Sequence, residues 1–217
     1  MKEKFTIFEN FKLLSVSQGL TGKMASMPAI TSSMLCNENC QKLMQIKGSV
    51  CEKCYTKKYL KARPSVDSCY RQNTDLLSSS IISKNQLPFI NAAYCRLESF
   101  GDIINATHLQ NYINLVKKNN HCIFSLFTKN YTVVFDYFKT HKQPSNLSIV
   151  LSSLMLNTPF EIEQCVGLKN LKIFTVYTKK YTDTHNVPIN CGKNRCIDCL
   201  RCYTKNKTPV FIAELLK

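Results

Sequence analysis

The sequence predicts an α/β protein whose parallel sheet forms a partial βα barrel, with cysteine-rich metal-binding segments at both ends of the chain. Three observations lead to this prediction. Between residues 88 and 180, short apolar runs alternate with polar turns and helix-patterned segments, which is the alternation of parallel α/β proteins. The runs are apolar on both faces, as strands buried between helix layers are. Cysteines gather on either side of this core, at residues 36–54 and 191–202.

The length of 217 residues fits one domain. We divide it into an N-terminal segment with the first cysteine group (1–60), a βα core (61–182), and a C-terminal cysteine cluster and tail (183–217). No apolar run approaches the roughly 18 residues that a membrane span needs, and the first residues lack the apolar stretch of a signal peptide. We therefore expect a cytoplasmic protein that makes no membrane contact.

The strands are predicted from short, β-prone runs flanked by polar residues. Residues 5–35 predict short strands and loops in no determined order, and a helix is expected over 66–82, after the turn at Pro64. The predicted core strands cover residues 89–97, 122–127, 147–154 and 171–177. A last apolar run, 209–215, is expected to pack back on the body.

The helices between these strands have local start signals besides their periodicity. Asn105 is a candidate cap for an apolar stripe at helical spacing, formed by Leu109, Tyr112, Ile113 and Val116. The segment after Asn130 ends with cations, which suit the carboxyl end of a helix dipole. A Thr-Pro-x-Glu sequence at residues 158–161 predicts a capped helix that Gly167 ends.

Polar residues follow the predicted strands. Such βα units form either an open doubly wound sheet or a partial barrel, and in both the carboxyl ends of the strands face one side, where sites are built. We favour the barrel because successive strands end with polar groups. The catalytic candidates are Glu98, Asp102 and Lys129, and the candidates for binding a substrate or cofactor are Arg96, Ser152, Ser153 and Lys179. The alternative is that these residues only begin loops. Glu98 favours a site, since a carboxylate within the alternation of a strand is costly to bury without a partner.

The second cysteine group is the strongest signal in the chain. Its members, Cys191, Cys196, Cys199 and Cys202, have the spacing C-x4-C-x2-C-x2-C. The x4-then-x2 opening matches a known iron–sulfur ligand spacing, and zinc also accepts four cysteines in C-x2-C pairs. Three consecutive short gaps favour a [4Fe–4S] cluster, whose irons spread the ligands over a larger cage.

The first cysteine group consists of two pairs joined by a loop, Cys36-x3-Cys40 and Cys51-x2-Cys54. This arrangement suits a zinc knuckle or a second cluster, and we expect metal ligation here too. Cytosolic thiols are kept reduced, so a chain with 12 cysteines is better interpreted as metal-binding or catalytic than as a disulfide scaffold.

The formal charge of +15 indicates attraction to polyanions such as nucleic acid. Thiolate ligands would reduce this charge, and lysines are spread along the chain, so a solvated basic surface is an equal alternative. Nucleic acid is therefore one candidate partner. No P-loop, dinucleotide glycine fingerprint or nucleophile elbow is present.

Several motifs, in their order along most of the chain, resemble the bacteriophage gene product eighty-eight family. They are Lys23-Met24 to Pro28, Cys51-x2-Cys54-Tyr55, a helix with Arg71 and Asn73, Arg96-x4-Gly101-Asp102, Phe127-Thr128-Lys129, Ser152-Ser153 and the terminal cysteine cluster. The resemblance implies a cysteine-rich phage protein that works in the cytoplasm of the host cell. That family is similar to radical S-adenosylmethionine enzymes, which implies a partial βα barrel with a [4Fe–4S] cluster at the strand ends and places Glu98 to Asp102 beside the cofactor. The radical-enzyme signature C-x3-C-x2-C is not kept, because ten residues separate Cys40 from Cys51.

The leading hypothesis is thus an iron–sulfur protein of phage type, with one or two [4Fe–4S] clusters and a substrate or cofactor site at the strand ends. Two alternatives remain open. One is a zinc-stabilised nucleic-acid-binding module, and the other is a phage protein that binds and inhibits a host protein.

Overall fold

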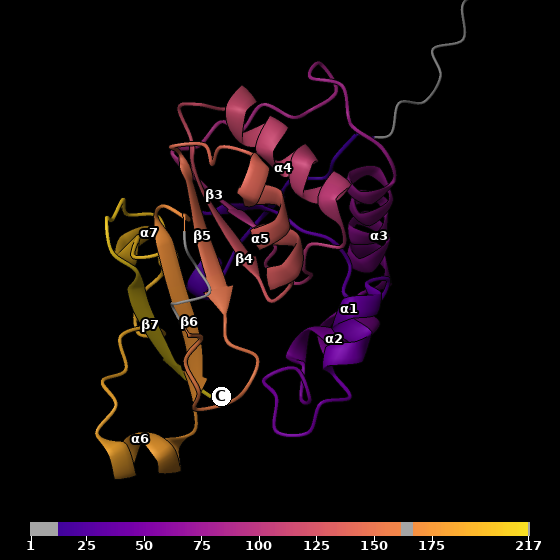
Figure 1. Cartoon of the computed structure of the whole chain (residues 1–217). Coiled ribbons are helices and arrows are strands. Elements are labelled where there is room, and N and C mark those ends of the chain that lie inside the picture. Colours follow the sequence, from indigo (N-terminus) through magenta and orange to yellow (C-terminus); the bar gives the residue numbers. More distant parts are fainter. Residues whose placement is uncertain (1–12, 162–166, 217) are drawn as a thin grey trace, which may run out of the picture.

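The computed structural model describes residues 13–161 and 167–216. Its centre is an open seven-stranded sheet whose strands follow one another in chain order (Figure 1). β1 is antiparallel to β2, and every later pair of neighbours is parallel. The strands are β1 (Ser17–Gln18), β2 (Pro28–Ile30), β3 (Tyr94–Leu97), β4 (Ile123–Thr128), β5 (Leu147–Ser152), β6 (Leu171–Tyr177) and β7 (Val210–Leu215). The predicted α/β class and parallel core are confirmed.

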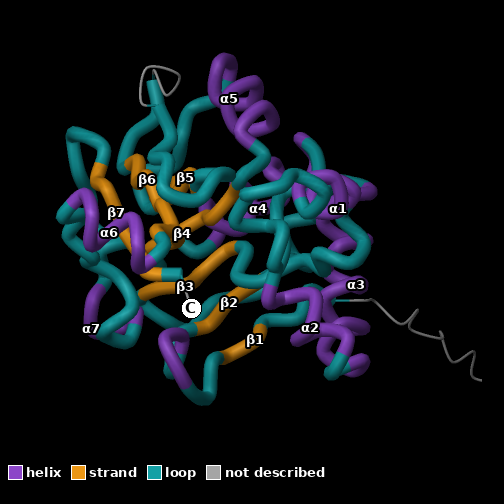
Figure 2. The backbone as a smooth tube through the Cα atoms, turned by 90° about the horizontal axis from the view of Figure 1, so that it is seen from below, coloured by secondary structure: helices purple, strands orange, loops and turns teal. Residues whose placement is uncertain are grey.

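The helices are η1 (Gly22–Met24), α1 (Glu38–Leu43), α2 (Tyr55–Lys61), α3 (Pro64–Ser79), α4 (Ala106–Lys118), α5 (Tyr131–Thr140), α6 (Lys179–His185) and α7 (Cys196–Cys199). Buried side chains of α3, α4 and α5 form one core with strands β3 to β6, so these three helices cover the same face of the sheet. Figures 1 and 2 show α1 and α2 on one side of the molecule and α7 on the other. Neither of the two described stretches contains a helix with the length and apolar character that a membrane span requires.

The core under these helices follows from alternation along the strands. Cys95 and Leu97 of β3 and Phe124 and Leu126 of β4 enter it, and all four are 0% exposed. The predicted apolar stripe of α4 is buried against them, behind a cap in which Asn105 Oδ1 accepts the His108 backbone N–H at 2.9 Å. Sequence periodicity therefore located this half of the fold correctly.

The second face of the sheet carries the opposite residues of each strand, among them Arg96 and Phe127, and the C-terminal segment covers it. The Tyr203 ring packs edge-on against Tyr94 of β3 at 5.4 Å between centroids. Lys172 of β6 is fully buried and donates from Nζ to the Thr204 carbonyl at 2.8 Å. These contacts hold the segment that follows the last cysteine against the sheet.

The two edges of the sheet approach each other without pairing. Lys23, in η1 between β1 and β2, forms an ion pair of 2.8 Å with Glu214 of β7. The Tyr203 hydroxyl lies 2.8 Å from the sulfur of Met27, just before β2. The sheet stays open, with β1 and β7 as its edges, so a closed barrel is not formed.

The structure differs from the sequence-based prediction at several places, and the first difference has a local cause. Residues 158–161 are not helical: the Thr158 hydroxyl donates to the Leu156 carbonyl at 3.3 Å instead of capping a helix, and the Phe160 ring packs on Tyr131. The rest of that predicted helix, 162–166, lies outside the described residues. The strand predicted over 89–97 begins only at Tyr94, and the short helices α1, α2 and α6 were not predicted.

Candidate functional site

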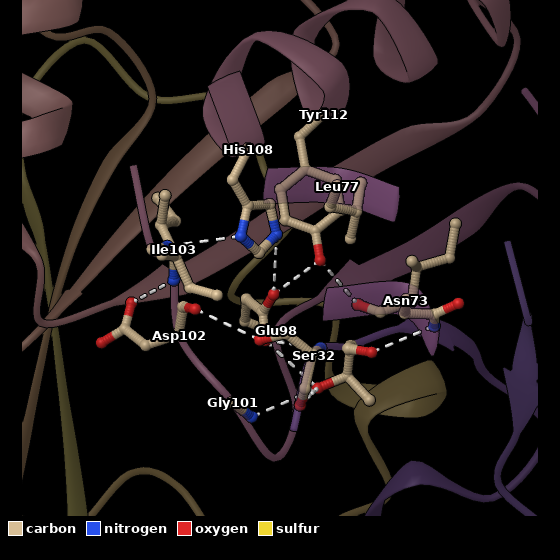
Figure 3. A network of polar contacts seen from close by, with 12 residues as sticks. Ser32, Asn73, Leu77, Glu98, Gly101, Asp102, Ile103, His108 and Tyr112 are labelled. Atoms are coloured by element: carbon tan, nitrogen blue, oxygen red, sulfur yellow. Dashed lines mark hydrogen bonds and ion pairs between the residues drawn. The ribbon is translucent and has the colours of Figure 1, made fainter. Parts of the chain in front are cut away.

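A buried polar network joins the ends of β2 and β3 to α4 (Figure 3). Glu98, the first residue after β3, is 2% exposed. One carboxylate oxygen accepts hydrogen bonds from the backbone N–H of Ser32 at 3.1 Å and from its hydroxyl at 3.0 Å. The other accepts from the Tyr112 hydroxyl at 2.6 Å and lies 3.2 Å from Nε2 of His108. These partners replace the hydration that burial removes from the carboxylate.

His108 faces Glu98 with its protonated nitrogen. Its Nδ1 accepts the backbone N–H of Ile104 at 3.3 Å, which leaves the proton of the neutral ring on Nε2. The approach of Nε2 to Glu98 is bent, outside good hydrogen-bond alignment. The contact is therefore electrostatic more than a directed hydrogen bond.

The backbone of the Glu98 to Asp102 turn is constrained at two positions. Glu98 has a φ of 58°, in the left-handed region that non-glycine residues rarely adopt. A Cβ on Gly101 would overlap the hydroxyl and carbonyl of Ser32 and lie 2.7 Å from Glu98 Oε2. The turn thus packs so closely on the end of β2 that position 101 requires glycine.

The same contacts decide how Glu98 and Tyr112 titrate. Burial by itself raises the pKa of Glu98, but the contacts with His108, Tyr112 and Ser32 outweigh it, and the pKa is lowered. Burial and the charge of Glu98 raise the pKa of Tyr112 well above its usual value. At neutral pH the network therefore holds a carboxylate and a protonated phenol.

Asp102 links the end of β3 to the end of β4. Its Oδ1 accepts from the Ile103 backbone N–H at 2.7 Å and from the Thr128 hydroxyl at 2.5 Å, and its Oδ2 accepts the Lys129 backbone N–H at 2.8 Å. Burial raises the pKa of Asp102 to about 6, although these bonds act in the opposite direction. A carboxyl group that titrates near neutral pH is suited to proton transfer.

The first cysteine group lies over the carboxyl ends of these strands. Val50 donates its backbone N–H to the Leu154 carbonyl, beyond the end of β5, at 2.8 Å. Burial raises the pKa of the Cys40 thiol, and the neighbouring charges of Asp102 and Glu98 add to the effect. Burial also raises the pKa of Cys51, against the charge of Lys129. Cys40 and Cys51 are therefore neighbours of Asp102 and Lys129. The proximity of Asp102 to Lys129 agrees with the expectation for polar residues at the strand ends.

The other two cysteines of this group differ in their surroundings. Cys54 packs, together with Cys40, against the small apolar cluster of Met34, Leu60 and Tyr70. Cys36 is exposed. The hydrogen bond to Asp67 raises the pKa of Arg71, and the nearby Cys36 adds to this effect.

The second cysteine group surrounds one cavity of about 170 Å³. All four thiol-bearing residues, Cys191, Cys196, Cys199 and Cys202, line it together with Lys23 and Tyr203. The loop is anchored at Cys191, whose backbone N–H donates to the Ala213 carbonyl of β7 at 3.0 Å. It reverses direction at Gly192 and Leu200, which both have positive φ values (108° and 50°).

Two cations stand beside these thiols. Lys23 Nζ lies 3.4 Å from the sulfur of Cys191. Burial raises the pKa of Cys202 to about 12, and the charge of Arg96 acts against this effect at both Cys202 and Cys196. The guanidinium of Arg96 also stacks 3.7 Å above the Phe127 ring. Arg96 therefore belongs to the surroundings of the second cysteine group.

The remaining candidates lie elsewhere. Ser152 and Ser153 are buried, and the Ser153 hydroxyl lies 3.0 Å from that of Thr175. Lys179 is on the surface in an ion pair with Asp183, its side chain 74% exposed. Its ion-pair partner belongs to the same short helix, α6, and not to the Asp102 and Lys129 neighbourhood.

Several residues of the Glu98 network and of the second cysteine group were not predicted from the sequence. Tyr112 is predicted only as part of the apolar stripe and His108 is not among the candidates, although their spacing of four places both on one helix face. The contacts of Lys23 and Lys172 could not be predicted, because their partners are 191 and 32 residues away in the chain.

The described parts of the chain contain no group of three or more Cys, His, Asp or Glu side chains that converge on one ion position. The two cysteine groups are also separate: the first lies beside Asp102 and Lys129, and the second beside Lys23 and Arg96.

A family model described as Gene product 88 matches residues 8–213. No curated protein and no solved structure matches the chain, so nothing in these comparisons supports the expected similarity to radical S-adenosylmethionine enzymes. The family match spans nearly the whole chain and agrees with the motifs that suggested it. This chain belongs to the gene product 88 family.

Proposed function

We propose that the protein is an iron–sulfur protein whose cluster is held by Cys191, Cys196, Cys199 and Cys202. The observation that carries the proposal is the cavity of about 170 Å³ that all four residues line. Four thiols reach it from a stretch of only 12 residues, and the rest of the lining combines apolar side chains with cations. An anionic, thiolate-ligated cluster suits such a lining.

The spacing of the four cysteines along the chain favours a cluster over zinc. A zinc ion needs four sulfurs at about 2.3 Å from one point, whereas a cage of four irons takes each sulfur on a different iron. Three consecutive short gaps separate the four cysteines, which line one cavity together. This arrangement fits a [4Fe–4S] cluster.

The cations would balance the charge of the cluster. Lys23 and Arg96 lie beside three of the four cysteines, and positive charge nearby favours thiolates. Lys23 also ties the site to β7 through Glu214. When bound, a cluster supplies electron transfer or Lewis-acid chemistry, and the residues of the chain would hold it, neutralise it and shield it from water.

The first cysteine group is proposed as a second metal site. Cys40 and Cys51 lie beside Asp102 and Lys129, and Cys54 packs on the same apolar cluster as Cys40. A centre here would face the strand ends, where the lysine would bind an anionic group and Asp102 would exchange a proton. The chain-order parallel sheet, with edges that meet through Lys23 and Glu214, supports the further proposal of a partial βα barrel.

We place the protein in the cytoplasm of the host cell. Cysteines of both groups are free thiols, and the cytosol keeps thiols reduced and available as ligands.

The test compares two serine variants of protein purified without oxygen. Cys196→Ser should lose the cluster of the second group, seen as loss of iron, sulfide and visible absorption. Cys69→Ser is the matched control, because Cys69 is an exposed cysteine outside both groups, and it should keep the wild-type iron content. Full iron content in Cys196→Ser would reject the assignment, as would a wild-type protein that holds zinc alone.

A further inference from the structure

The segment that includes α2 is strongly basic. Residues 53–63 contain five cations and no carboxylate, although the whole chain has only 29 cations in 217 residues. The five are Lys53, Lys57, Lys58, Lys61 and Arg63, and all are exposed. Among the described residues, none of them is paired with a carboxylate. This density is high enough to form a local positive surface, which we call the α2 basic face.

Aromatic rings accompany these cations. Tyr55, the first residue of α2, is 69% exposed and touches Phe100 with its ring edge-on at 6.3 Å. Tyr59 stacks on Phe100 at 4.9 Å, and the Arg63 guanidinium lies 4.2 Å above the Tyr59 ring. The helix is thereby fixed on the Glu98 to Asp102 turn, while Tyr55 offers most of its surface to solvent.

The α2 basic face lies apart from the proposed cluster. Figures 1 and 2 show α2 on the side of the molecule opposite α7, which carries Cys196 and Cys199. Binding at α2 can therefore be altered without touching the ligands of the second cysteine group.

We propose that the α2 basic face binds single-stranded nucleic acid, with the lysines on phosphates and Tyr55 stacked against a base. Unpaired lysines attract any polyanion, but an exposed ring among them matches a strand with accessible bases. A duplex keeps its bases stacked inside, and an acidic protein segment offers no bases. The inference is independent of the cluster proposed at the second cysteine group, whereas Lys53 and Tyr55 flank Cys54 of the first group.

The test measures fluorescence anisotropy of labelled single-stranded DNA and RNA of one sequence, with the full-length protein, over a range of salt concentrations. Reversing two charges in Lys57→Glu/Lys58→Glu should reduce the slope of log affinity against log salt by about 1.4, since each phosphate contact on a single strand contributes about 0.7. Tyr55→Ala should weaken binding roughly tenfold, the effect of one base–aromatic stack.

The matched control is Lys142→Glu/Lys169→Glu, which makes the same charge change at two exposed lysines beside α5. It should leave the salt slope within experimental error of wild type, and all variants should keep wild-type circular dichroism. The proposal is overturned if the two double variants lose affinity equally, because the binding would then follow net charge alone. It is also overturned if Tyr55→Ala binds as well as wild type and polyglutamate competes as well as the oligonucleotide, which would indicate an acidic protein partner.

Discussion

Removal of the Tyr112 hydroxyl is the sharpest perturbation of the buried Glu98 network. The hydroxyl donates to Glu98 at 2.6 Å, and both side chains are buried. A hydrogen bond to a charged group contributes about 1.5–3 kcal/mol. Because His108 still faces the same oxygen at 3.2 Å, we expect Tyr112→Phe to cost about 2 kcal/mol. For a chain of this length, this corresponds to a Tm lower by roughly 4–8 °C.

The assay is thermal unfolding followed by circular dichroism, with two control variants. Tyr137→Phe removes a hydrogen bond of the same 2.6 Å length, but to the neutral acceptor Gln110, and should cost about 1 kcal/mol. Tyr55→Phe changes an exposed ring and should have little effect. The reasoning is refuted if Tyr112→Phe lowers Tm no more than Tyr55→Phe does.

The pH dependence of the same variant gives a second check. The folded-state pKa of Glu98 is lowered, so the stabilisation from this carboxylate is present above the usual glutamate pKa and is lost as pH falls through the folded value. The difference in the free energy of unfolding between wild type and Tyr112→Phe should therefore be constant from pH 7 to about pH 5 and shrink below about pH 4.

Three further outcomes are expected. Gly101→Ala should destabilise the fold by about 1–3 kcal/mol in urea unfolding, because its Cβ would overlap Ser32; an unchanged midpoint would contradict the packing described for this turn. The pKa of Asp102 is raised to about 6, so the folded state takes up a proton before the unfolded chain does. The free energy of unfolding of wild type, relative to that of Asp102→Asn, should therefore rise by about 1 kcal/mol from pH 7 to pH 5. No rise would count against the raised pKa. Lys172→Met removes the donor to Thr204 that holds the end of the second cysteine loop, so the variant should lose iron faster to a chelator than wild type; equal rates would mean that the loop does not depend on this anchor.

The strands of the core were predictable because their pattern is local. β6 begins and ends where its apolar run does, and β4 is displaced by one residue. The helix predicted at residues 158–161 was wrong, because a Thr-Pro-x-Glu sequence acts as a helix cap only where the following residues are helical. In the structure Asn157 has a φ of 64° and accepts the Thr178 backbone N–H at 2.8 Å instead.

The candidate site was predictable in its parts and not in its arrangement. Strand-end polarity identified Glu98, Asp102 and Lys129, because polar residues after parallel strands meet at one edge. The same rule also predicted Lys179, which instead lies on the surface as part of a short helix. It could not show that Arg96 would lie beside Cys196 and Cys202, since that proximity depends on how the C-terminal loop folds over the second face of the sheet.

The sequence also could not predict that the two cysteine groups are separate. Cysteine spacing indicates which thiols can share a centre through short loops, but the distance between the groups depends on the sheet. The first group lies at the strand ends beside Asp102 and Lys129, whereas the second lies where Lys23 meets β7.

The decisive test of the iron–sulfur proposal is to quantify iron, acid-labile sulfide and zinc per chain in wild-type protein purified without oxygen. We expect brown protein with iron and sulfide in equal amounts, about four of each for the second cysteine group alone and about eight if the first group also holds a cluster. Colourless protein with about one zinc per cysteine group, or with no bound metal, would contradict it.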